Sequence, residues 1–258
     1  MEINKNKFIE AINSDGFYLA RNILDEKYIL KARKELAEAI AKEDEYHKRE
    51  DHIDHGMVLL CCKYGGVFIE ILDNMNVIEP FHWLMGEGCI LYSQTSTSMP
   101  PYSGNYSSRI HVDSPRIIPG YLSTFMALIL LDDFTQENGA TWFLPNSHNS
   151  YEQPSSDFFY TNAKRLVASA GSVFFWNPRI WHSGGRNETA LWRHAMTIVM
   201  CRPYMKQRLD IPRALEGMDL SNLSDLAKQK LGFYAQVPVN YDEYYQPIEK
   251  RKFRQKME

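Results

Sequence analysis

Two histidines and an aspartate have the types and the spacing of a metal site. His111 and Asp113 lie two positions apart, and His182 follows the aromatic segment 172–181. On an extended strand, residues i and i+2 point to the same face, so His111 and Asp113 would present an imidazole and a carboxylate side by side. With His182 they would form a two-histidine, one-carboxylate site, which leaves adjacent coordination positions open and suits non-haem Fe(II) and oxygen chemistry. The spacing therefore predicts a catalytic metal site at these three residues.

Arg193 extends the prediction to a second ligand. The stretch between His182 and Arg193 contains the turn formers 183–189, so we expect the chain to fold back as a hairpin centred near Asn187. The Cβ atoms of residues 182 and 193 would then lie about 5–8 Å apart, as cross-strand neighbours do. An arginine at this reach holds a carboxylate with two hydrogen bonds. A small dicarboxylate with one end on the metal and the other on Arg193 is 2-oxoglutarate, which we expect as the cosubstrate.

Five more side chains are candidates for the same site. Tyr92 and Gln94 belong to a predicted strand that precedes the first metal ligand, and are candidates to hold the metal-side carboxylate of the cosubstrate. Arg116 closely follows the metal-binding motif and is expected either to reach an anionic substrate or cosubstrate, or to make a surface ion pair. Trp142 and Trp181 are candidates to line a substrate pocket, although tryptophans beside such strands equally often pack in the core.

A rival metal site and several other catalytic patterns carry less weight. His52 and His55, with Asp54 between them, would share one face of a helix, but the stretch is highly charged and lacks an apolar shell. His148 lies in a loop pattern, and we expect a structural role for it. The sequence contains no HExxH, GxxxxGK[ST] or GxSxG pattern.

The spacing of apolar residues predicts the elements that position these groups. Phe8 and Ile12 indicate a short helix, residues 17–20 a short strand, and the apolar positions after Asp25 an amphipathic helix of about five turns. Residues 42–54 are expected to be the helix end and a solvated loop, and residues 215–230 a final helix. Short apolar runs separated by turn formers are typical of a β-sandwich or barrel. After residue 80 these runs are 89–92, 125–131, 141–144, 172–176 and 196–201.

The composition excludes several classes of protein. With 44% hydrophobic and 24% charged residues, the 258-residue chain resembles an ordinary soluble globular protein. A net charge of −3 leaves no basic footprint for nucleic acid. No apolar stretch approaches the ~20 residues of a membrane span, and the opening residues lack an apolar signal core, so we expect neither a membrane partner nor export. The four cysteines show no paired spacing, and we expect buried thiols in a reducing cytoplasm.

Together these motifs resemble one family. From about residue 8 to 203 the sequence is similar to the phytanoyl-CoA dioxygenase-like (PhyH) Fe(II)/2-oxoglutarate oxygenases. One departure is Ser183, which directly follows the second histidine where many members carry Gly and then Ser. The resemblance rests on residues 15–19, 111–113, 132–141, 144–148 and 171–175, and on His182 with Arg193.

The resemblance implies a fold and a set of cofactors. The expected fold is mainly β, a double-stranded β-helix or cupin-like jelly roll with flanking N-terminal helices, and the cofactors are Fe(II), 2-oxoglutarate and O2. We expect one domain over residues 1–258, with a helical part at about 1–80, a jelly-roll core at about 85–205, and a C-terminal helical segment and tail at 206–258. The protein is expected to be a monomer or homodimer.

The expected activity is hydroxylation of a small metabolite or natural-product intermediate, with release of succinate and CO2. The carboxylate of Asp113 favours oxygenation over halogenation, because related halogenases leave this ligand position to chloride. Desaturation, epimerisation and cyclisation stay open, since the same oxidant performs them. A different class also stays open, a cupin-like protein that binds a metal or small ligand without turnover.

Overall fold

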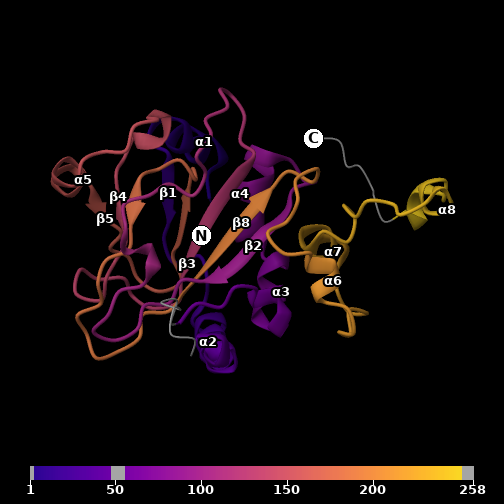
Figure 1. Cartoon of the computed structure of the whole chain (residues 1–258), viewed down its shortest axis with the longest axis horizontal. Helices are drawn as coiled ribbons and strands as arrows, with labels where there is room; N and C mark the ends of the chain where they lie inside the picture. Colours follow the sequence, from indigo (N-terminus) through magenta and orange to yellow (C-terminus); the bar gives the residue numbers. More distant parts are fainter. Residues whose placement is uncertain (1–2, 48–55, 252–258) are drawn as a thin grey trace.

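Two antiparallel β-sheets form the centre of the protein (Figure 1). The computed structural model describes residues 3–47 and 56–251. The five-stranded sheet has the order β1-β6-β3-β8-β2, and the three-stranded sheet the order β5-β4-β7. The strands are β1 (Phe17–Ala20), β2 (Ile90–Ser96), β3 (Thr124–Leu130), β4 (Trp142–Phe143), β5 (Lys164–Arg165), β6 (Val173–Trp176), β7 (His182–Ser183) and β8 (Ala195–Cys201). Each apolar run of the sequence therefore contains a strand, as expected.

The central strand β3 separates two hydrophobic cores. Successive side chains of a strand point to opposite faces. Phe125, Ala127 and Ile129 accordingly pack in a core on one face, which we call the helix-side core. Met126 and Leu128 pack in the other, the inter-sheet core. Because both faces are covered, β3 is an almost continuous apolar run, which is how the sequence shows it.

The inter-sheet core joins the two sheets. Phe143 of β4 packs on Phe174 of β6 with ring centroids 5.0 Å apart, and on Phe17 of β1 at 4.7 Å. Trp176 continues this aromatic row toward the end of β6, with its ring centroid 6.1 Å from that of His182. The aromatic residues therefore bind the sheets together and lead directly to the candidate metal ligands.

The helices flank the large sheet, and most of them come before β2 or after β8 in the chain. Figure 1 shows α8 at one end of the molecule and α5, β4 and β5 at the other. The α-helices are α1 (Lys5–Ser14), α2 (Glu26–His47), α3 (Val67–Glu70), α4 (Met75–Met85), α5 (Ser156–Asn162), α6 (Ile211–Ala214), α7 (Asp225–Leu231) and α8 (Tyr241–Tyr244). Short 3-10 turns are η1 (Cys61–Tyr64), η2 (Ile71–Asp73), η3 (Tyr106–Ser108), η4 (Ser147–Asn149) and η5 (Ile248–Lys250).

Helix α1 has a clear beginning and end. The Asn4 side chain accepts a hydrogen bond from Lys7 N at 3.0 Å and caps the first turn. The helix ends at Ser14, and the chain turns away at Gly16, whose φ of +84° favours glycine. A Cβ atom there would lie 2.6 Å from Nδ1 of His148 and 2.8 Å from Cδ1 of Ile180, so the glycine also permits close packing beside the β7 strand.

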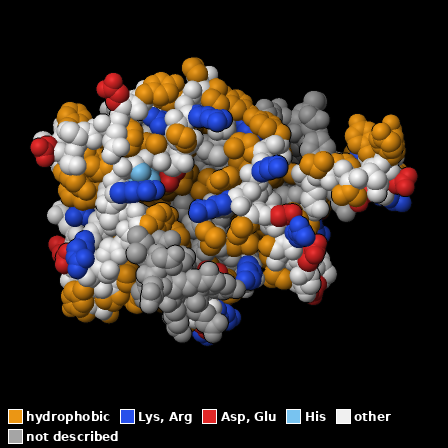
Figure 2. Space-filling model, in the orientation of Figure 1, with side chains coloured by type: hydrophobic (Ala, Val, Ile, Leu, Met, Phe, Trp, Pro, Cys, Tyr) orange, Lys and Arg blue, Asp and Glu red, His pale blue; other side chains and the backbone are white. Residues whose placement is uncertain are grey.

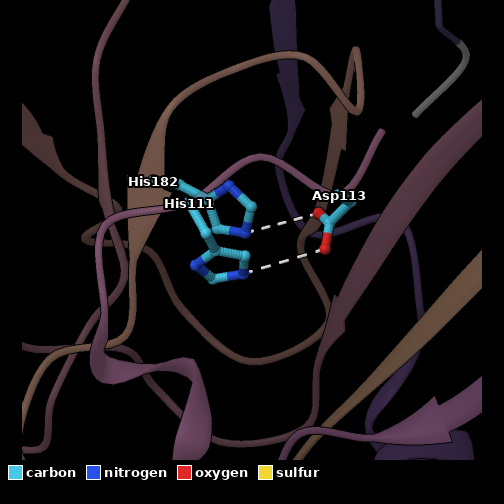
Figure 3. A group of neighbouring side chains, drawn as sticks. All are labelled: His111, Asp113 and His182. Carbon is cyan, nitrogen blue, oxygen red and sulfur yellow. Dashed lines mark ion pairs between the residues drawn. The ribbon is translucent and has the colours of Figure 1, made fainter. Parts of the chain in front are cut away.

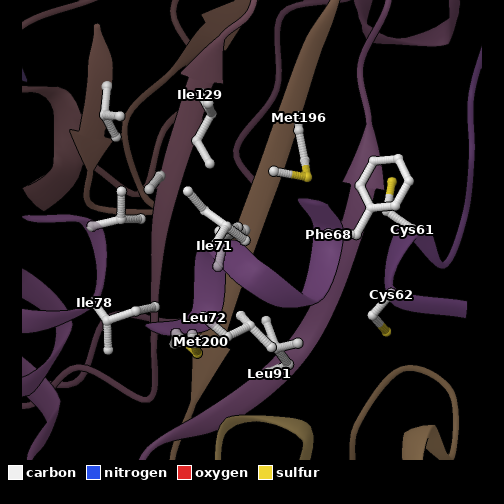
Figure 4. Close-up of a cluster of buried hydrophobic side chains, with 14 of the residues drawn as sticks. Cys61, Cys62, Phe68, Ile71, Leu72, Ile78, Leu91, Ile129, Met196 and Met200 are labelled. Atoms are coloured by element: carbon white, nitrogen blue, oxygen red, sulfur yellow. The ribbon is translucent and has the colours of Figure 1, made fainter. Parts of the chain in front are cut away.

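The helix-side core holds the helices against the sheet. Figure 4 shows side chains of η2 and α4 meeting those of the strands, with Cys61 and Cys62 at one side of the cluster. All four cysteines are buried and free, which confirms the expectation of buried thiols. Among the described residues, no helix has the length and apolar content to cross a membrane.

Two boundaries differ from the sequence-based expectation. Helix α2 continues to His47, so the charged residues 42–47 are helical rather than part of a loop. The expected helix over 215–230 is largely wrong, since only Asp225–Leu231 is helical near its end. Asp219 accepts a hydrogen bond from Ser221 N at 3.0 Å, which competes with helix formation, and Ser224 caps α7 by accepting one from Ala227 N at 2.9 Å.

Candidate metal centre and cosubstrate pocket

His111, Asp113 and His182 form one compact group. The Asp113 carboxylate faces both imidazole rings (Figure 3), with Oδ1 at 3.8 Å from Nε2 of His111 and Oδ2 at 3.4 Å from Nε2 of His182. One ligand atom from each residue lies within 4.8 Å of the others. The two rings are 16% and 12% exposed and the carboxylate 30%. Three atoms this close, on a partly open wall, can ligate a single metal ion.

Backbone carbonyls orient both imidazole rings. Nδ1 of His111 lies 2.8 Å from the carbonyl oxygen of Arg109, and Nδ1 of His182 lies 3.0 Å from that of Ile180. A carbonyl only accepts hydrogen bonds, so each Nδ1 donates its proton and each Nε2 keeps its lone pair for a metal. Burial, with the nearby ring of His182, lowers the pKa of His111 and so favours the neutral form that metals bind.

The chain reaches this geometry without the expected strand around His111. His111 and His182 instead form an isolated antiparallel bridge, with N–H to O distances of 2.9 Å in both directions. Two residues further along, the backbone N–H of Asp113 donates to Pro178 O at 2.9 Å. The two motifs therefore meet through a short bridge and a loop contact. Among the described residues, these three are the one group of His, Cys, Asp or Glu side chains placed to hold a metal ion.

A large cavity opens in front of the three ligands. It measures about 590 Å³, within the range of small-molecule pockets. On the face shown in Figure 2, a histidine reaches the surface with an acidic side chain beside it, and Lys and Arg side chains surround a largely uncharged centre. We call the cavity in front of the three ligands the metal cavity. Its lining includes His111, Asp113, His182, Tyr92, Tyr106, Arg116, Tyr121, Trp176, Tyr204 and Arg208.

A second, narrower space of about 60 Å³ runs from His182 to Arg193. We call it the cosubstrate pocket. It shares Thr97, Trp176 and Thr197 with the metal cavity, as well as Ser107 and His182, so the two spaces communicate at the metal ligand. The sequence predicts that Arg193 lies within reach of the metal site. In the structure, Arg193 and the metal ligand His182 line the same pocket.

Arg193 is fixed rigidly at the end of this pocket. Its side chain is buried, its Nη1 donates to Gly139 O, and its Nη2 donates to Thr97 O at 3.1 Å. The guanidinium carbon lies 4.1 Å from the ring centroid of Phe134. The buried Nε has no hydrogen-bond partner. Burial lowers the pKa of Arg193 to about 9, so the group stays protonated at neutral pH and can bind an anion.

The route that brings Arg193 to the pocket differs from the expected hairpin. His182 pairs with Phe143 of β4, whereas Arg193 forms an isolated bridge with Met99. The two residues are therefore not cross-strand partners. Asn187 closes the intervening loop by hydrogen bonds with its neighbours, Nδ2 donating to Leu191 O at 2.7 Å. The sequence predicts that His182 and Arg193 lie near the same site, and they do, but each residue is held there by a different backbone partner.

Of the five additional candidates, Tyr92 and Arg116 line the metal cavity, whereas Gln94 does not. A bulge in β2 precedes Ser93, and from there alternate residues face the cavity, so Gln94 points to the helices. Its side chain is fully buried and donates from Nε2 to Phe68 O at 2.7 Å. Gln94 is therefore positioned as a link between β2 and α3, and it does not contact the cosubstrate pocket.

The two candidate tryptophans also lie outside both spaces. Trp142 stacks with Arg165, whose guanidinium carbon lies 4.1 Å from the ring, and Trp181 packs with Leu144 and Phe159 in a small separate cluster. Residues flanking His182 and Phe143 point to the opposite face of the small sheet, which explains both positions. They pack the sheet from outside, and the expectation that they line a substrate pocket is not met.

His148 occupies the structural position expected for it. Its ring is buried beside α1, with Nε2 3.3 Å from Asn13 O. The rival group of His52, Asp54 and His55 lies outside the described residues.

The structure adds residues that the sequence analysis missed. Trp176 lines both spaces. Strand alternation could have predicted this position, because Trp176 shares a face of β6 with Phe174. Thr97 and Thr197 face each other between the spaces, with hydroxyl oxygens 3.3 Å apart. Arg208 reaches the metal cavity from a loop beyond β8, and no sequence pattern signals it.

Comparison with known proteins identifies the family. The chain belongs to the phytanoyl-CoA dioxygenase (PhyH) family, which matches residues 12–195. It is also 30% identical over 253 residues to the uncharacterized protein Rv1501 of Mycobacterium tuberculosis, covering 95% of this chain and 93% of that one. Members of this family are oxygenases that depend on Fe(II) and 2-oxoglutarate. The resemblance noted from the sequence is thereby confirmed.

Solved structures agree on the fold. The crystal structure of the epimerase SnoN in complex with Fe3+, alpha ketoglutarate and nogalamycin RO has a TM-score of 0.62 and 15% identity, over 83% of this chain and 91% of that chain. HygX from Streptomyces hygroscopicus, with nickel and 2-oxoglutarate bound, has a TM-score of 0.61 and 14% identity, over 80% and 89%. These likenesses, with the two antiparallel sheets and flanking helices, confirm the jelly-roll fold.

The residues present fit the cofactors of the family. Two imidazole nitrogens and a carboxylate oxygen are the donor set that holds non-haem Fe(II) with open positions. The buried, unpartnered Nε of Arg193 supplies a charged donor for a carboxylate in the adjoining pocket. The expected cofactors Fe(II), 2-oxoglutarate and O2 are confirmed at the level of the family.

Proposed function

We propose that this protein hydroxylates a small metabolite or natural-product intermediate, with release of succinate and CO2. The observation that carries the proposal is the meeting of two spaces at His182. The narrow one is lined by a buried cation, Arg193, and the wide one by Asp113, whose carboxylate is 30% exposed. A dicarboxylate and a larger substrate can thus approach one metal ion from different sides.

Each chain residue has a separate role in this proposal. His111, Asp113 and His182 would hold the iron, and Arg193 would bind the far carboxylate of 2-oxoglutarate with charge-assisted hydrogen bonds. Tyr92 is the candidate for the metal-side carboxylate that remains, since it lines the metal cavity. When bound, iron and 2-oxoglutarate together supply the oxidising power of the reaction.

The protein contributes orientation and exclusion of water. The carbonyls that accept from Nδ1 of His111 and His182 fix both rings before any ligand arrives. Trp176 lines both spaces and belongs to the inter-sheet core, so it gives both spaces an apolar wall. Such preorganisation lowers the cost of assembling metal, cosubstrate and substrate in one geometry.

The ligand set favours oxygenation over halogenation, and it leaves desaturation, epimerisation and cyclisation open beside hydroxylation. Asp113 supplies a carboxylate where a halogenase would leave room for chloride, which supports oxygenation. Epimerisation is the main alternative, because the similar structure of SnoN is that of an epimerase. A binding protein without turnover is less well supported, since it has no need of a buried arginine in a pocket beside three metal ligands. We also propose that residues 1–258 act as one cytoplasmic domain, as a monomer or homodimer.

The experiment is a screen for succinate release with Fe(II), 2-oxoglutarate and O2 over a panel of metabolites. The mass of the consumed compound is then measured, and a gain of one oxygen atom means hydroxylation. An unchanged mass with altered stereochemistry means epimerisation instead. His111→Ala should abolish succinate release, whereas Arg21→Gln, an exposed substitution after β1, should not. Succinate formation that persists in the His111 variant would rule out this metal site.

A further inference from the structure

Two arginines in the metal cavity have no partner among the residues that the structure describes. Arg116 and Arg208 line the cavity that holds His111 and Asp113. Within the part of the chain that the structure describes, neither guanidinium takes part in a hydrogen bond or ion pair. The backbone around Arg208 is nevertheless fixed, because its N–H donates to Tyr92 O at 2.9 Å. Both side chains are exposed, so they can move to meet a ligand.

Neighbouring arginines differ because the fold already uses them. Arg179 donates from Nη1 to Ser114 O at 3.2 Å and is almost fully buried. Arg202 donates from Nε to Leu122 O at 3.0 Å and from Nη1 to Met85 O at 2.9 Å. These two tie loops to the sheet. Arg116 and Arg208 have no such task.

The charges of the cavity do not balance without an anion. Of the described residues in the lining, Asp113 is the only acidic one, and it belongs to the metal site. Iron with Asp113 and the cosubstrate dianion with Arg193 make a set of charges close to neutral. The positive charges of Arg116 and Arg208 are additional to that set. Guanidinium groups pair preferentially with carboxylate or phosphate oxygens.

The rest of the cavity wall suits an apolar or aromatic body. Tyr92, Tyr106, Tyr121 and Tyr204 line it together with Trp176. The hydroxyl groups of Tyr121 and Tyr204 are hydrogen-bonded to each other, which brings the polar tips of both side chains together in the lining of the cavity. Aromatic side chains with polar tips offer flat surfaces for packing and hydroxyls for orientation.

We infer that the substrate carries a carboxylate or phosphate group, which Arg116 and Arg208 bind while its apolar or aromatic body lies along the tyrosines. This inference rests on the proposed function, because it takes the metal cavity as the substrate site. Arg116 and Arg208 then determine specificity, by selecting oxyanions over neutral molecules of equal size. They orient the substrate rather than take part in the oxidation.

The test uses matched probes and the full chain. Isothermal titration calorimetry, without oxygen, measures binding of 3-phenylpropionate, phenyl phosphate and neutral 3-phenylpropanamide, with and without Fe(II) and 2-oxoglutarate. One or both anions should bind roughly tenfold or more tightly than the amide, as expected for hydrogen bonds to charged groups. Arg116→Gln and Arg208→Gln should each remove most of that difference. Arg21→Gln, which lies outside the metal cavity, should not. The tighter of the two anions identifies the oxyanion.

Three results would overturn the inference. The first is equal affinity for the amide and both anions, or no binding of any probe. The second is anion binding that survives in the double variant. The third is a loss of 2-oxoglutarate affinity in Arg116→Gln and Arg208→Gln as large as the loss of anion affinity, which would give the pair to the cosubstrate. Failure of 2-oxoglutarate to bind the wild type would reject the proposed function alone, since the probes are also measured without it.

Discussion

Arg193 offers the sharpest test of how the cosubstrate is held. Arg193 is 3% exposed, and its guanidinium gives hydrogen bonds to Gly139 O and Thr97 O, while Nε stays unpartnered. Replacement by Gln removes the charge and the fork of donors. Replacement by Lys keeps the charge but not the fork. Since the pKa of Arg193 is about 9, the charge is present throughout a titration at pH 7.

The magnitude follows from the hydrogen bonds that 2-oxoglutarate would lose. A hydrogen bond to a charged group contributes about 1.5–3 kcal/mol. Its loss in Arg193→Gln should raise the Kd for 2-oxoglutarate roughly 10- to 150-fold. Arg193→Lys should give an intermediate loss. The Gln variant also leaves Gly139 O and Thr97 O without a donor, so the free energy of unfolding should fall by about 1–3 kcal/mol.

The assay separates binding from stability. Protein loaded with Fe(II) under anaerobic conditions is titrated with 2-oxoglutarate, and the weak visible charge-transfer band of the chelate reports occupancy. Arg165→Gln is the matched control, because Arg165 stacks on Trp142 at 4.1 Å and donates to Ala140 O at 2.6 Å, much as Arg193 contacts Phe134 and Gly139. It lines neither space, so the control should lose stability and keep its 2-oxoglutarate affinity.

Two results would refute the reasoning about Arg193. A folded Arg193→Gln variant with a Kd for 2-oxoglutarate near that of the wild type would show that another group holds the far carboxylate. An equal loss of affinity in Arg165→Gln would show that the effect is a general loosening of the small sheet.

Three further predictions concern the metal, a buried lysine and a half-buried histidine. His182→Ala, or removal of metal by a chelator, should abolish the charge-transfer band without unfolding the protein, and a persisting band would contradict the assigned ligands. Lys230 is fully buried and donates to the carbonyl oxygens of residues 87 and 89 at 2.8 and 3.0 Å, so Lys230→Met takes this donor from both oxygens and should lower the free energy of unfolding in urea by about 1–3 kcal/mol. The partly exposed Lys228→Met is its control, and equal losses would refute the argument. Burial lowers the pKa of His194, so its neutral form stabilises the fold, and that stability is lost as the pH falls below about 6.5 toward the folded pKa. Thermal unfolding of His194→Gln should therefore depend less on pH between 7.5 and 5.5 than that of the wild type, and identical slopes would contradict this.

Local patterns allowed much of the fold to be predicted. The alternation and apolar runs of the strands are set by side chains that must be buried on one or both faces, and such patterns survive without knowledge of partners. The same holds for helix α1, whose Phe8 and Ile12 are spaced by one turn and are both buried. The C-terminal helix was less predictable, because apolar residues continue through a segment whose polar side chains cap and turn the backbone.

The sequence by itself determined the chemistry of the site. His111 and Asp113 are two positions apart, a spacing that keeps an imidazole and a carboxylate close together along the chain, here through an isolated bridge and a loop contact. His182 and Arg193 could be added because their types match what iron and a dicarboxylate require. Residue type and short-range spacing are properties of the chain alone, so they needed no tertiary structure.

Only the tertiary structure decided which face each remaining side chain presents and which groups stay unpartnered. A bulge in β2 turned Gln94 toward the helices and left Tyr92 at the metal cavity. Long-range pairing with β4 and Met99, rather than a local hairpin, brought His182 and Arg193 to one pocket. Arg208 joined the same cavity from a distant loop. Each of these placements depends on contacts between segments far apart in the chain, and no local spacing encodes them.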